Sequence, residues 1–132
     1  MAKLTFTKDY SLKLSPKQLF NLISTPDGLS KWFAEDAVYD RNREIFNFRF
    51  DSSDHLAKMV SVKPNKLVKF EFLDEDGNHI ADPSWTELKI NTSELTNEVF
   101  LTITDYSGMS DLDDLEELWD DLVYALSDSL NS

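Results

Sequence analysis

Residues 112–130 read LDDLEELWDDLVYALSDSL, and the expected architecture follows from this segment. With about 100° of turn per residue, its apolar side chains fall on one side of a helix and its acids on the other. The apolar side holds Leu112, Leu115, Leu118, Trp119, Leu122, Val123, Leu126 and Leu130. A helix from Asp111 to Leu130 would be roughly 30 Å long, enough to cross a small sheet, and Ser110 is its expected N-cap.

The chain ahead of this helix is dominated by strand patterns. Phe46, Phe48 and Phe50 alternate with Asn47 and Arg49, which predicts a strand with one buried face. Similar patterns predict strands over residues 4–14, 37–39, 45–50, 56–62, 67–73, 85–90 and 99–103. Short turns separate them, and the pair Asp76-Gly77 is a hairpin signal. We therefore expect an antiparallel meander of about seven strands.

Two short helices are predicted between the first and second strands. Ser15, Pro16 and Gln18 form a capping-box start, and Thr25-Pro26 opens a second helical segment that runs through Trp32 and Phe33. The predicted fold class is therefore α+β, with a curved antiparallel sheet wrapped around a long C-terminal helix.

Composition limits the classes of function. With 132 residues we expect a single domain, residues 1–132, and with no cysteine there are no disulfides or thiolate metal sites. A net charge of −12 disfavours binding to nucleic acid and to anionic membranes. No apolar run approaches the roughly 20 residues of a membrane span. Since the N-terminal residues also lack the apolar core of a signal peptide, we expect a cytoplasmic protein.

The chain shows no motif for catalysis, metal binding or a cofactor. Its histidines, His55 and His79, lie at a predicted strand start and beside a predicted turn, so we interpret both as surface residues. Asp74, Asp76 and Gly77 superficially resemble a calcium loop, but the glycine is misplaced and the closing glutamate is missing. We interpret this segment as a turn, and predict no catalytic or metal-ligating residue and no cofactor.

The large aromatic side chains give the most information about a possible binding site. A curved sheet covered by a helix can leave an apolar cavity lined by aromatic residues, and such cavities are common ligand sites. The predicted ligand-binding residues are Trp32, Phe48, Phe50, Trp85, Leu115 and Trp119. The alternative is that these rings only fill the core.

One segment carries a family resemblance. Ser15-Pro16, Phe20 and the run TPDGLSKWF over residues 25–33 resemble the entry segment of the START-like superfamily, most of all the branch named after the activator of the 90-kDa heat-shock protein ATPase. Trp119, Val123 and Leu126 are similar to the end of its last helix, although many members have Gly where this chain has Leu118. The resemblance implies a helix-grip fold whose members bind lipids, hormones or polyketides, act as cyclases, or assist chaperones.

Three functions remain open at this stage. The first is a non-catalytic domain that holds a small apolar or amphipathic ligand between sheet and C-terminal helix. The second is a protein-interaction or co-chaperone module with a packed core, whose partner is another protein or a second copy of the chain. The third is a cyclase-like enzyme that uses a buried carboxylate, tyrosine or histidine. A cavity separates the first from the second, and a titratable group on its wall with a shifted pKa favours the third.

Overall fold

A computed structural model describes residues 3–108 and 111–129, and it confirms the α+β prediction. The elements follow one another as β1 (Leu4–Leu12), α1 (Pro16–Ser24), α2 (Pro26–Leu29), β2 (Asp36–Asp40), β3 (Ile45–Phe50), β4 (Ser53–Lys63), β5 (Leu67–Phe72), β6 (Trp85–Thr92), β7 (Val99–Ser107) and α3 (Leu112–Ser129).

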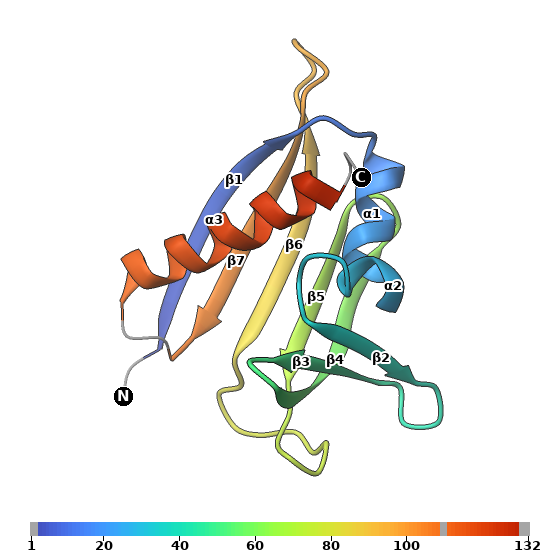
Figure 1. The fold of residues 1–132 in the computed structure, drawn as a ribbon, viewed down its shortest axis with the longest axis vertical. Coiled ribbons are helices and arrows are strands. Elements are labelled where there is room, and N and C mark those ends of the chain that lie inside the picture. Colours follow the sequence, from blue (N-terminus) through green and yellow to red (C-terminus); the bar gives the residue numbers. More distant parts are fainter. Residues whose placement is uncertain (1–2, 109–110, 130–132) are drawn as a thin grey trace.

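The strands form one antiparallel sheet in the order β1-β7-β6-β5-β4-β3-β2. Each strand from β2 to β7 lies beside its neighbour in the chain, as a meander requires. The first strand, β1, instead pairs with the last one, β7, from Leu4 opposite Ser107 to Leu12 opposite Val99. This pairing places the start of β1 directly beside the end of β7 (Figure 1).

The sheet curls strongly toward its β2 edge. Figure 1 shows β2 and β3 turned across the direction of β6 and β7. The register between β4 and β5 shifts between Met59 and Ser61, which marks a bulge. Since an extra residue bends a strand and increases its local twist, the bulge contributes to this curl.

Helix α3 crosses the concave face of the sheet in front of β1, β7 and β6 (Figure 1). It buries Leu115, Trp119, Val123 and Leu126, as its amphipathic pattern predicts. The expected N-cap, Ser110, and the expected last residue, Leu130, lie outside the described residues. Within them, Asp111 Oδ1 accepts a hydrogen bond from the Asp114 backbone N–H at 2.8 Å, which caps the helix.

The outer side of α3 is tied to β1 by charge. Lys8 Nζ lies 2.9 Å from Glu116 Oε2 and 3.0 Å from Asp120 Oδ1. The Tyr10 hydroxyl donates to the same Asp120 oxygen at 2.6 Å. The hydrogen bonds from Tyr10 and Lys8 hold the pKa of the Asp120 carboxyl below its ordinary value. Part of the acidic helix surface therefore fastens the helix to the edge strand.

The short helices have the predicted caps. Ser15 Oγ accepts from the Gln18 N–H at 3.1 Å, and Gln18 Oε1 accepts from the Ser15 N–H at 3.0 Å, so the capping box is confirmed. Thr25 Oγ1 accepts from the Gly28 N–H at 3.0 Å and starts α2. This helix ends at Leu29, earlier than the segment through Phe33 that we predicted.

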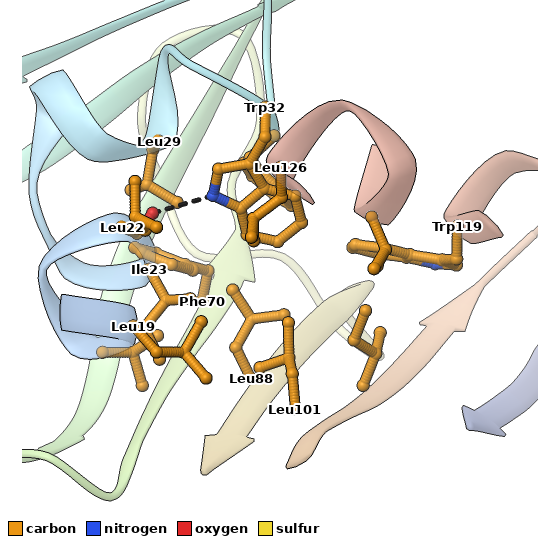
Figure 2. Packing of buried hydrophobic residues seen from close by; sticks show 14 of the residues in the cluster. Leu19, Leu22, Ile23, Leu29, Trp32, Phe70, Leu88, Leu101, Trp119 and Leu126 are labelled. Atoms are coloured by element: carbon orange, nitrogen blue, oxygen red, sulfur yellow. Dashed lines mark hydrogen bonds between the residues drawn. The ribbon is translucent and has the colours of Figure 1, made fainter. Parts of the chain in front are cut away.

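Trp32 joins the two short helices to the core. Its indole Nε1–H donates to the carbonyl oxygen of Leu22 at 2.8 Å (Figure 2). Leu22 lies in the last turn of α1, where carbonyl groups have no partner inside the helix. The Trp32 indole therefore gives a hydrogen-bond partner to a carbonyl group at the end of α1. Its ring also packs among Leu22, Leu29 and Leu126 (Figure 2).

The connection between β5 and β6 differs from the prediction. Asp76-Gly77 does not form a two-residue hairpin, because residues 73–84 separate the strands. Asp74 organises a local turn: its N–H donates to the Asn78 carbonyl oxygen at 3.0 Å, and its Oδ1 accepts from the N–H groups of Asp76 and Asn78. The interpretation of Asp74, Asp76 and Gly77 as a turn is confirmed, whereas the tight hairpin was wrong.

Replacement of Gly28 by Ala should be severely destabilising. A Cβ at this position would collide with the Asn21 carbonyl oxygen and lie 2.7 Å from Leu22 Cα, both of which are backbone atoms that cannot rotate away. We expect a loss of about 3 kcal/mol or more, at the upper end of overpacking effects, measured by urea unfolding.

Gly108→Ala is the matched control, since a Cβ there would meet no atom within 4 Å. If both variants unfold at the same urea concentration, the close contact between α2 and the end of α1 is refuted.

Candidate ligand-binding site

A pocket of about 710 Å³ lies between α3 and one end of the concave sheet face. Its helix side consists of Leu118, Trp119, Leu122 and Ala125, and residues 31–35 after α2 form an adjoining wall. The sheet and the turns next to it contribute Phe50, Asp51, His55, Leu56, Phe72, Leu73, Ser84, Thr86, Asp105 and Ser107. The volume falls within the roughly 300–1,000 Å³ of small-molecule sites.

Interlocked rings build the apolar wall of this pocket. The Phe33 ring lies 5.9 Å from that of Trp119, 5.6 Å from that of Trp32 and 5.5 Å from that of Phe50, measured between ring centroids. Trp32 and Trp119 lie 6.4 Å apart. Since Phe33 is buried among rings from three different elements, the wall is held in place by packing on every side.

The inner wall also carries a buried carboxylate. Asp105 in β7 is only 8% exposed, and its Oδ2 accepts a 2.8 Å hydrogen bond from the Trp119 indole N–H. Burial raises the pKa of the Asp105 carboxyl above its ordinary value, and the Trp119 hydrogen bond offsets part of this rise. Within residues 3–108 and 111–129 the structure shows no cationic partner for this carboxylate.

Two hydroxyl residues lie beside Asp105. Thr86 is its direct partner in the antiparallel pairing of β6 and β7, and it is buried. Ser107 follows two residues later on the same strand face, and its Oγ is buried without a hydrogen-bond partner in the described part of the chain. The pocket therefore combines its aromatic wall with a buried polar group of residues at the end of β7, and Lys31, Glu35, Asp51 and His55 are further polar residues of its lining.

The structure brings together three of the six predicted site residues. Trp32, Phe50 and Trp119 line the pocket. Phe48 and Leu115 are completely buried and are not part of its lining. That these residues bind a ligand remains a prediction.

The expected position of Trp85 was wrong. In β6 the buried side chains are Thr86, Leu88 and Ile90, so Trp85 points to the opposite face of the sheet. There its ring stacks on Tyr106 at 5.9 Å, and Lys69 Nζ lies 4.2 Å from its centroid. A one-residue error in strand phase moves a side chain to the other face, and the inward residue at this point is Thr86.

Sequence reasoning missed Asp105 as a site residue, although a signal exists. Val99, Leu101 and Ile103 alternate along β7 as inward apolar positions, and Asp105 occupies the next inward place. An acidic residue at the next inward position of an otherwise apolar strand indicates Asp105 as a candidate site residue.

The two histidines lie in different places. His55 is exposed, as expected, yet it also lines the pocket, with its ring centroid 5.3 Å from that of Phe50. His79 is exposed near Glu71 and lies outside the pocket lining.

The described residues contain no cluster of three His, Asp or Glu side chains arranged to hold a metal ion. Among them, no helix combines the length and apolar character needed to cross a membrane.

The comparison with protein families identifies the fold. A START-like superfamily domain matches residues 1–132. The chain belongs to the START-like superfamily. The arrangement of a seven-stranded curved sheet around a C-terminal helix is the helix-grip fold that the resemblance implied, and this expectation is confirmed.

Solved structures support the same START-like fold. The Aha1 dimer from Colwellia psychrerythraea matches with a TM-score of 0.73 and 20% identity, covering 96% of each chain. Protein MLL2253 from Mesorhizobium loti matches with a TM-score of 0.74 and 14% identity, covering 97% of each chain. DynU16, from the dynemicin biosynthetic locus, has a TM-score of 0.72 and 13% identity over 97% of this chain and 47% of its own. Among curated proteins, none matches the chain.

Trp119→Ala should greatly lower the stability of this START-like domain. Trp119 is 2% exposed, contacts Trp32 and Phe33, and anchors α3 to β7 through Asp105. Truncation of a buried tryptophan typically costs about 3–5 kcal/mol. Chemical unfolding should show a loss in this range, and Tyr124→Ala on the same helix, at a side chain 74% exposed, should be nearly neutral. Equal losses would refute the anchoring role of Trp119.

Asp105→Asn should raise stability at neutral pH. A carboxyl with a raised pKa holds its proton more tightly in the folded state, so wild-type stability falls as pH rises through the unfolded pKa of about 3.9 and then the folded one. Asparagine keeps an acceptor for the Trp119 N–H and never ionises. The melting temperature of the variant should exceed that of wild type at pH 7, and the difference should vanish below the unfolded pKa.

The matched control is Asp121→Asn, which removes the same charge from an exposed position on α3. A constant difference between Asp105→Asn and wild type at every pH would exclude titration of Asp105 as its cause.

Proposed function

We propose that this domain is a non-catalytic binding protein for a small amphipathic molecule, which it holds between α3 and the concave face of the sheet. The observation that carries the proposal is the pocket of about 710 Å³, with five large aromatic rings in its lining and the buried Asp105 at one end. An apolar body would contact the rings, and a polar group would reach the carboxylate. Such a combination of apolar wall and few polar groups is typical of ligand sites.

The exposed residues of α3 support this proposal. Leu118 is 40% exposed although it belongs to the apolar side of the helix, and both Leu118 and Leu122 line the pocket. A bound apolar molecule would cover these side chains and remove them from water. Covering about 100 Å² of apolar surface is worth roughly 2.5 kcal/mol before the costs of binding.

The family relation is consistent with the proposal. START-like domains commonly hold ligands or act in co-chaperone roles, and DynU16 is a neighbour from a biosynthetic locus. The Aha1 neighbour is a dimer, which supports a homodimer or other protein partner as the alternative. The interaction-module alternative assumes a packed core, so the pocket supports the binding proposal over it.

A cyclase-like activity is the second candidate, and one observation favours it. Burial raises the pKa of the Asp105 carboxyl on the pocket wall, and a raised pKa favours the protonated form that a general acid requires. The two candidates differ in the fate of the bound molecule. Mass spectrometry of a ligand recovered after incubation should show an unchanged mass and fragmentation pattern for a binding protein, and an altered product for an enzyme.

Pocket filling provides the test of binding. Ala125 lines the pocket from α3, so Ala125→Phe would place a ring in the space of the ligand. In a thermal-shift screen of long-chain alcohols, amines, carboxylic acids and polycyclic aromatics, a ligand of the wild type should add about 2.7 kcal/mol at a hundredfold excess over its Kd. The stabilisation should disappear in Ala125→Phe and persist in Tyr124→Ala.

Circular dichroism and the melting temperature without ligand would verify that Ala125→Phe is folded. If no class of compound stabilises the wild type, the binding proposal is wrong and the interaction-module alternative becomes the better one.

A further inference from the structure

We propose that the pocket selects apolar molecules that carry a protonated amine, and that Asp105 is the residue that pairs with this amine. The inference rests on the proposed binding function and adds to it the chemical class of the ligand. It derives from the position of Asp105, from the groups around it and from the charge of the chain.

The geometry leaves one side of the carboxylate available. The Trp119 N–H binds Oδ2 at 2.8 Å and fixes the orientation of the group against α3. Within the described residues no donor is found on the other oxygen, Oδ1. The Oγ of Ser107, two residues along the same strand face, is buried without a partner. A carboxylate oxygen and a free hydroxyl oxygen on one side of the pocket form a pair of acceptors.

An ammonium group matches this pair better than other polar groups do. It has three donors and no acceptor, which suits a pocket end where the oxygen of the carboxylate and that of the serine can both accept. Trp119 and Trp32 both line the pocket, with ring centroids 6.4 Å apart. Indole faces attract cations within about 6 Å, so a ligand cation that lay over either ring would gain a second favourable contact.

The charges around Asp105 also favour a cationic ligand. A buried carboxylate without a cation is costly, because its partial desolvation is not repaid by an ion pair. Lys31 and His55 line the pocket but form no ion pair with Asp105. Glu35 and Asp51, the other titratable residues of the lining, would repel an anion. A cationic ligand would supply the missing partner of Asp105.

The charge of the whole chain favours a cation as well. A net charge of −12 gives a field that attracts positive molecules and repels fatty acids and phosphates. A neutral hydroxyl could also donate to Asp105, but it would leave the buried charge without a counter-charge. For these reasons we assign the pocket to amines rather than to acids or alcohols.

The experiment compares three probes of equal chain length: decylamine, decanol and decanoate. Isothermal titration calorimetry at pH 7, below the critical micelle concentrations, should give decylamine a Kd at least about tenfold lower than that of decanol, with decanoate the weakest. In Asp105→Asn, which retains an acceptor for Trp119, the Kd of decylamine should rise to that of decanol.

Two controls separate the pocket from the surface. Asp121→Asn removes the same charge from an exposed position of α3 and should leave the preference for decylamine intact. Ala125→Phe should abolish the binding of decylamine and decanol alike, since it occupies the pocket.

The outcomes distinguish this inference from the proposed function. If all three probes bind with equal Kd, or if Asp105→Asn keeps the preference for decylamine, the amine inference is refuted while the binding function stands. If decanol binds more tightly than decylamine, a neutral donor is the ligand class and the inference is again wrong. If no probe binds and the broader screen is also negative, the proposed function fails first.

Discussion

The hydrogen bond between the Trp119 indole and the Asp105 carboxylate determines how α3 sits on the sheet. It links the middle of α3 to the end of β7, while Lys8 and Tyr10 hold the outer side of the helix through Asp120. These contacts hold α3 on both sides, next to the pocket that its residues Leu118, Leu122 and Ala125 line. The same contact orients the carboxylate at the polar end of the pocket, so one interaction serves both the fold and the site.

The pocket remains open because its lining combines rigid rings with small inward side chains. Phe33 locks the aromatic wall against Trp32, Phe50 and Trp119. Elsewhere in the lining the chain has Ser84, Thr86, Ser107 and Ala125, which leave space that larger residues would fill. The inward side of β7 changes from Val99, Leu101 and Ile103 to Asp105 and Ser107 at the point where the pocket begins. This change in polarity divides one strand into a core part and a part that lines the pocket.

The sequence predicted the elements well because periodicity and caps are local properties. The capping box at Ser15 and the amphipathic pattern of α3 depend on residues within a few positions of each other. The site was predicted less well, since it depends on strand phase and on distant contacts. Trp85 was placed on the wrong face by one residue, and the bulge between Met59 and Ser61 left no visible signal in the pattern. Asp105 acquires its environment from Trp119 on another element, and no local rule reports such a contact.

The position of β1 at the edge beside β7 has a consequence for synthesis on the ribosome. Its ladder partners are residues 99–107, so the first strand to be made has no neighbour until almost the whole sheet has been translated. The meander β2 to β7 can pair progressively as it emerges, because each strand there joins the one before it. The apolar residues of β1, among them Phe6 and Leu12, stay without their native cover during this time. Closure of the domain is therefore a late event that joins β1 to β7, and the apolar side chains of β1 stay exposed to aggregation until then.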